Sequence, residues 1–72
     1  MLSGIVRSYD RGRGYGHIAP DRGGADVFVH KLELRQSGLE ELKAGDAVWF
    51  AVRSDGFKFR ATTISILSAP AR

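Results

Sequence analysis

The chain has 72 residues, two histidines and no cysteine, with 11 Lys and Arg against 8 Asp and Glu for a net charge of +3. This length fits one domain near the lower limit for a single apolar core, and the lack of cysteine excludes disulfides and thiolate metal sites. No apolar run approaches the roughly 18 residues that cross a bilayer, and the N-terminus lacks a secretory stretch, so we expect a cytoplasmic protein.

The first predicted hairpin joins residues 4–9 to residues 13–18. Residues 4–9 are apolar or favour strands, and residues 10–12 form a turn sequence. In the second strand Tyr15 and His17 share one face, because alternate side chains of a strand point the same way. We expect this face to be the solvent-exposed one, with two rings side by side.

A second hairpin leads into residues 26–30. Proline and paired glycines within residues 20–24 end the preceding strand and turn the chain. Alternate valines then face the core, while Phe28 and His30 point to the other side, beside the rings of the preceding strand if the two pair antiparallel. The two strands predict an exposed surface of rings, called here the ring platform: Tyr15, His17, Phe28 and His30.

Three more segments complete the predicted elements. Residues 31–43 predict a loop with one helical turn, because their leucines do not alternate and Ser37-Gly38 interrupts a longer helix. Residues 47–52 alternate in hydropathy and predict a fourth strand, and the last strand is expected over residues 59–67.

Five short strands with little helix predict an all-β barrel, because closing a sheet on itself hides strand edges. We expect this domain to span residues 1–67, with a short frayed tail at residues 68–72. Gly14 and Gly16 are expected to face inward at a curved strand. The predicted core comprises Val6, Ile18, Val27, Val29, Val48, Phe50, Val52 and Ile64.

Exposed rings beside cations suit unpaired nucleic acid, because every base has a π-face and every nucleotide carries a phosphate. Arg7, Arg13 and Lys31 flank the ring platform and are expected to lie along the phosphate backbone. Other cations in turns are expected to be merely solvated: Arg11, Arg22 and Lys58. Lys43 and Arg60 receive no assignment from the sequence.

Tyr9 is a further candidate contact whose direction depends on the local backbone. Plain alternation places Tyr9 opposite Val6, whereas a bulge near Ser8 would turn its ring partly inward. Tyr9 is counted among the expected nucleic-acid contacts with its direction left open.

A second hypothesis concerns a protein partner. If residues 48, 50 and 52 are core, Trp49 points outward, and Phe57 and Phe59 are expected near it across the hairpin. Such an apolar patch would mark a protein-interaction surface, although Trp49 could equally lie flat on the barrel under Phe59. An enzyme is not expected, because no acid–base pair, nucleophile with its base, or metal cluster is visible.

Three segments in this order resemble the bacterial cold-shock domain. Residues 4–10 are similar to the family's opening Gly-x-Val-Lys-Trp-Phe-Asn, residues 13–18 to Lys-Gly-Phe-Gly-Phe-Ile, and residues 26–31 to Asp-Val-Phe-Val-His-Phe. The likeness runs from Gly4 to about Ile64. It implies a five-stranded antiparallel OB-fold (oligonucleotide-binding) barrel that binds single-stranded RNA or DNA as an RNA chaperone or antiterminator, with no cofactor and as a monomer or weak homodimer.

Three departures from the family pattern fall on the predicted binding face. Ser8 stands where the family has tryptophan, and His17 and Lys31 stand where it has phenylalanine. Stacking on an aromatic ring contributes about 1–3 kcal/mol per base, whereas an exposed lysine–phosphate contact weakens with salt. We therefore expect weaker and more salt-dependent binding than in typical members of the family.

Overall fold

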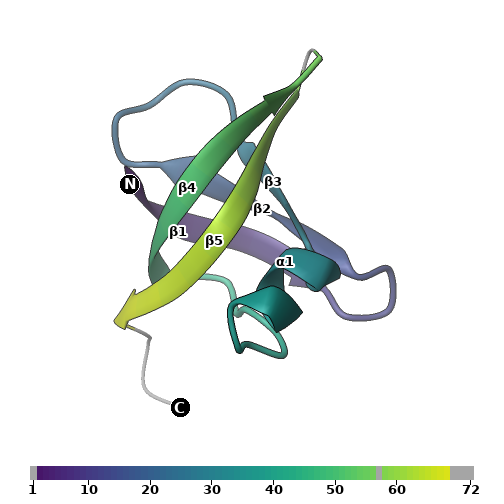
Figure 1. Cartoon of the computed structure of the whole chain (residues 1–72). Helices are drawn as coiled ribbons and strands as arrows, with labels where there is room; N and C mark the ends of the chain where they lie inside the picture. The colour runs from purple at the N-terminus through teal and green to yellow at the C-terminus, as the bar shows by residue number, and fades with distance from the viewer. Residues whose placement is uncertain (1, 57, 69–72) are drawn as a thin grey trace.

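The computed structural model describes residues 2–56 and 58–68, which form five strands and one short helix. The elements are β1 (Leu2–Asp10), β2 (Tyr15–Pro20), β3 (Val27–His30), α1 (Lys31–Gln36), β4 (Ala47–Asp55) and β5 (Lys58–Ser68). The sheet closes into a barrel in the order β1-β2-β3-β5-β4. Figure 1 shows α1 and the β1–β2 turn at the same end of this barrel.

The predicted five-stranded barrel is confirmed, with one difference in strand direction. The β1–β2, β2–β3, β1–β4 and β4–β5 pairs are antiparallel. β3 and β5 instead pair in parallel, through Phe28 and Arg60. Because this pair joins the two ends of the sheet, it closes the barrel.

The barrel core agrees with the predicted set except at Val52, which is only partly buried. Val52 follows a register shift in the β4–β5 pair and lines a hollow at the barrel rim. Three further apolar side chains are buried that strand alternation did not predict: Leu34, Leu42 and Ala61. The first comes from α1 and the second from the loop after it, so these segments cover one end of the barrel.

A bulge bends β1 beside the ring platform. Val6 pairs with Ile18 and Ser8 pairs with His17, so Arg7 is the extra residue. Beyond this bulge the Tyr9 ring is partly buried against the core, which confirms the inward-turning alternative.

Gly16 and Gly14 differ in position. Gly16 faces inward within β2, as predicted, and a Cβ there would collide with the Ser8 carbonyl oxygen and lie 2.9 Å from Tyr9 Cα. The prediction for Gly14 was wrong, because β2 begins at Tyr15 and Gly14 lies in the preceding turn with φ +78°. The stem of the exposed Lys31 lies against Gly14 and could move aside, so it is the positive φ that favours glycine at this position.

The single helical turn predicted after β3 is the helix α1. It ends at Gln36, and Gly38 follows with φ +80°, as the Ser37-Gly38 interruption predicted. Glu33 and Leu34 are its buried residues. The helix therefore contributes both an apolar and a charged side chain to the interior.

The predicted boundary of the tail lies close to the end of the described chain. Ser68, assigned to the tail by the prediction, is the last residue of β5. Residues 69–72 and Phe57 lie outside the described residues. No helix in the described part of the chain is long and apolar enough to cross a membrane.

The close approach of β1 to β2 predicts a large effect of Gly16→Ala. The added Cβ meets backbone atoms that cannot move aside, so we expect the free energy of unfolding to fall by about 3 kcal/mol. Gly12→Ala is the matched control, because the nearest atom to its Cβ is a carboxylate oxygen of Asp10 at 3.3 Å. Urea denaturation should show a change within about 0.5 kcal/mol for this control. Equal losses for the two variants would contradict the close-approach argument.

Candidate nucleic-acid interface

The four predicted rings lie together on β2 and β3. Tyr15 stacks on Phe28 with a centroid distance of 5.3 Å and an angle of 23° between the ring planes. His17 stands edge-on to both, 6.1 Å from Tyr15 and 5.8 Å from Phe28. His30 is tilted 37° to Phe28 at 6.5 Å. All four rings remain partly exposed, so the ring platform is a continuous aromatic surface open to solvent.

The strand register explains this arrangement. Tyr15 pairs with His30 and His17 pairs with Phe28, so the rings occupy two adjacent cross-strand pairs on one face. The other face of the same strands carries the buried Val27 and Val29. Period-2 alternation therefore places the rings outside once the valines are inside.

His30 has a second structural task. It is the N-cap of α1, and its Nδ1 accepts a hydrogen bond from the Leu32 backbone N–H at 3.2 Å. A neutral imidazole that accepts at Nδ1 carries its proton on Nε2. This bond fixes the ring at the junction of β3 and α1.

The two histidines do not face each other as a pair of metal ligands would. The register makes them diagonal neighbours, with Phe28 opposite His17 and Tyr15 opposite His30. Within residues 2–56 and 58–68 no group of three or more His, Cys, Asp or Glu side chains is placed to hold a metal ion.

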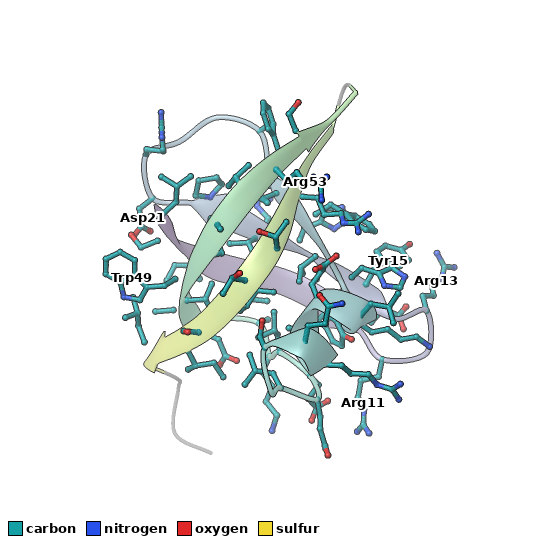
Figure 2. All side chains as sticks on the ribbon, in the orientation of Figure 1. Arg11, Arg13, Tyr15, Asp21, Trp49 and Arg53 are labelled. Atoms are coloured by element: carbon teal, nitrogen blue, oxygen red, sulfur yellow. The ribbon has the colours of Figure 1, made fainter. Side chains whose placement is uncertain are left out.

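Arg13 lies at the edge of the ring platform (Figure 2). Its guanidinium donates a hydrogen bond to the Tyr15 hydroxyl at 3.2 Å and lies 3.8 Å from Asp10 Oδ2. The bond to Tyr15, the charge interaction with Tyr15 and then the Asp10 carboxylate raise the pKa of Arg13 above its ordinary value. Arg13 therefore holds a positive charge beside the Tyr15 ring.

Arg7 and Lys31 are the other two residues predicted to contact the phosphate backbone, and they have different neighbours. Arg7 is exposed but forms an ion pair with Asp26, with Nε and Oδ1 3.1 Å apart. Lys31 lies against the β1–β2 turn, and its backbone N–H donates to the Gly14 carbonyl oxygen at 2.9 Å. A bound phosphate would compete with Asp26 for Arg7.

Arg60 lies beside the ring platform, although the sequence alone gave it no role. It pairs with Phe28 across the parallel β3–β5 bridge, and its Nε and Nη2 donate to Oε1 of the buried Glu33 at 3.1 and 2.8 Å. Arg53 is opposite Arg60 on β4. No sequence signal reveals this cluster, because β3, α1 and β5 are brought together only by barrel closure.

A hollow of about 570 Å³ adjoins the ring platform at Ser8 and is called here the Ser8 hollow. It is lined by Ser8, Tyr9, Asp10, Arg11, Gly12, Tyr15, Gly16 and His17. The small Ser8 side chain leaves this space open next to two of the platform rings. The hollow is open to solvent beside Tyr15.

Trp49 and Phe59 do not form the predicted apolar patch, and its third member, Phe57, lies outside the described residues. Trp49 is exposed, as predicted, but it pairs with Ser65, whereas Phe59 pairs with Ser54. The two rings are thus five positions apart along β4, or roughly 16 Å. Phe59 instead lines a rim hollow with Leu2, so it neither extends a patch at Trp49 nor covers that ring.

Comparisons with known proteins agree with this architecture. Residues 2–67 match the model of the 'Cold-shock' DNA-binding domain. A probable cold shock protein of Sinorhizobium fredii is 40% identical over 55 residues, which are 76% of this chain and 80% of the relative. Cold shock protein ScoF of Streptomyces coelicolor is 42% identical over 52 residues, covering 72% and 78%. Cold shock-like protein CspA of Bordetella pertussis is 34% identical over 67 residues, covering 93% and 100%.

The surroundings of Tyr9 predict a loss of stability at alkaline pH. Burial and then Glu41 raise the pKa of the Tyr9 phenol above 10.0, against the opposing effect of Arg11 and Arg35. The unfolded chain therefore loses the Tyr9 proton first as the pH rises past 10, which favours unfolding until the folded phenol also ionises. Urea denaturation near neutral pH and above pH 10 should show a smaller loss for Tyr9→Phe than for the native chain. An identical loss in both proteins would contradict this assignment.

Proposed function

Because the chain belongs to the 'Cold-shock' DNA-binding domain family, a family of nucleic-acid-binding domains, we propose that it binds single-stranded RNA or DNA on the ring platform. The observation that carries the proposal is the contact of four partly exposed rings across β2 and β3. Unpaired bases stack on such rings without regard to sequence, because every base has a π-face.

Base stacking supplies the larger part of the proposed affinity. Tyr15 and Phe28 are stacked on each other and present neighbouring surfaces, while His17 stands edge-on to both. Each stacked base contributes about 1–3 kcal/mol. Ser8 stands where typical members of the family have tryptophan, so this face lacks one ring and has the Ser8 hollow in its place. Fewer bases therefore stack, and the affinity is lower than on a fully aromatic face.

Phosphate contacts supply a salt-dependent part. Arg13 and Lys31 adjoin the ring platform, and Arg7 reaches the same region from the β1 bulge. Each neutralised phosphate of a single strand contributes about −0.7 to the slope of log K against log salt concentration. Because Arg7 must leave Asp26 to bind a phosphate, its contribution is the smallest of the three.

The proposed role is that of an RNA chaperone or antiterminator rather than an enzyme. A protein that binds unpaired strands and not hairpins shifts the equilibrium toward the unpaired state by mass action. This mechanism consumes no ATP and uses no cofactor. Its strength is set by the protein concentration relative to the dissociation constant.

Replacing Phe28 with alanine tests the ring platform. We expect Phe28→Ala to weaken binding of a short oligothymidine by about 1–3 kcal/mol, or about 5- to 150-fold. Phe59→Ala is the matched control, because Phe59 is an exposed ring that lines the rim hollow with Leu2 and Val52, and none of the four platform rings lines that hollow. Fluorescence anisotropy of a labelled oligonucleotide measures both variants, and circular dichroism checks their folding.

The proposal fails if Phe28→Ala and Phe59→Ala bind equally well while both remain folded. Chemical-shift mapping gives an independent measurement on the native chain. Titration with the same oligothymidine should shift the signals of Tyr15, His17 and Phe28 and leave that of Trp49 in place. Shifts confined to Trp49 would instead support a different binding face.

A further inference from the structure

A second hollow lies between the β1–β2 turn and α1, and it is called here the basic hollow. We propose that the basic hollow binds a phosphate of the nucleic acid that lies on the ring platform, through Arg11, Lys31 and Arg35. The inference rests on the proposed function and extends the interface to Arg11 and Arg35. The sequence had assigned Arg11 to the solvated turn residues and had given Arg35 no role.

The lining of the hollow suits an anion. Its volume is about 560 Å³, and its lining is Tyr9, Arg11, Lys31, Arg35, Gly38, Leu39 and Glu40. Lys31 and Arg35 are four residues apart on α1, so they share one face of the helix. Arg11 approaches from the β1–β2 turn, at the end of the barrel where α1 lies (Figure 2). Two separate elements therefore direct cations into one space.

The charges around the hollow are not balanced. Arg11 Nε lies 3.2 Å from Glu41 Oε2, and Glu40 also lines the space. Within residues 2–56 and 58–68 no ion pair joins Lys31 or Arg35 to an acid. Like charges four residues apart destabilise a helix by about 0.2–0.5 kcal/mol. An anion held between Lys31 and Arg35 would remove this repulsion.

The basic hollow continues the surface of the ring platform. Tyr9 and Arg11 line both the basic hollow and the Ser8 hollow, and the Ser8 hollow is also lined by Tyr15 and His17. Tyr9 is close enough to Glu41, Arg11 and Arg35 for all three to affect the pKa of its phenol. A strand that stacks on the platform and passes Tyr9 thus enters a space lined by cations.

The residue types favour a phosphate over other ligands. Arginine presents a planar array of donors that matches two phosphate oxygens, and lysine adds a point charge. The neutral phenol of Tyr9 is a further donor. The three cations outnumber the two nearby carboxylates, Glu40 and Glu41, which disfavours a metal ion. The phosphate can be an internal phosphodiester or a terminal phosphate, since both present the same oxygens.

The test compares Arg35→Gln with Arg22→Gln, which removes the same charge from the β2–β3 loop. Glutamine is a good helix former, so α1 is expected to persist, and circular dichroism checks this. Binding is measured with oligothymidines of about four and about eight nucleotides, lengths within the range for OB folds. The longer strand carries more internal phosphates, so it can more readily place one in the basic hollow while its bases stay on the ring platform. Each length is prepared with and without a terminal phosphate.

If the basic hollow binds an internal phosphate, Arg35→Gln should weaken binding of the unphosphorylated eight-nucleotide strand by about 3- to 10-fold. The slope of log K against log salt concentration should fall by about 0.7. The four-nucleotide strand has fewer internal phosphates and should be weakened less, and a terminal phosphate on it should increase its response to Arg35→Gln if the hollow binds the end of the strand. Arg22→Gln should leave the binding of both oligonucleotides unchanged.

Equal binding by Arg35→Gln and Arg22→Gln for every oligonucleotide would overturn the inference. That result leaves the proposed function standing if Phe28→Ala still weakens the four-nucleotide strand. If the native chain binds neither length, the proposed function fails instead. The reversal Arg35→Glu gives a second check, because a negative charge in the basic hollow should lower affinity for the longer strand further than Arg35→Gln does.

Discussion

Closure of a small sheet into a barrel is the constraint on which the remaining structure depends. A closed barrel has one inside, and β3 fills it with Val27 and Val29. Each inward valine turns the next residue outward, so Phe28 and His30 are displayed because their neighbours are buried. The same rule on β2 buries Ile18 and exposes the rings before it. The apolar core and the candidate interface are thus two faces of one alternation.

Local patterns in the sequence predict the features that one strand or one hairpin decides. These include the four rings, most of the core and the end of the helix before Gly38, while the bulge that turns Tyr9 inward was one of two alternatives that the sequence left open. The prediction that Gly14 lies within a strand was wrong, because a glycine in a turn and a glycine in a strand have similar neighbours in the sequence. The separation of Trp49 from Phe59 depends on how far β4 and β5 extend, and alternation does not reveal strand length.

The charged contacts were the least predictable, because they join residues that closure alone brings together. Glu33 and Arg60 are 27 positions apart in sequence, yet two hydrogen bonds link α1 to β5. A helix of six residues does not persist by itself in water. Its position depends on this pair, on the burial of Leu34 and on the cap from His30. The cations of α1 are therefore fixed by tertiary contacts rather than by helix propensity.

The cap also gives His30 a property that the other rings lack. Its Nδ1 lone pair is already occupied by the Leu32 amide, so only the π-face and the Nε2 edge are open to a nucleotide. A nucleotide that binds the imidazole in this orientation stabilises the first turn of α1, and by thermodynamic reciprocity a well-formed α1 strengthens that nucleotide's binding. If the ring platform binds nucleic acid as proposed, local unwinding of the short helix and release of the ligand would be coupled, and the time that the ligand stays bound would depend on helix stability.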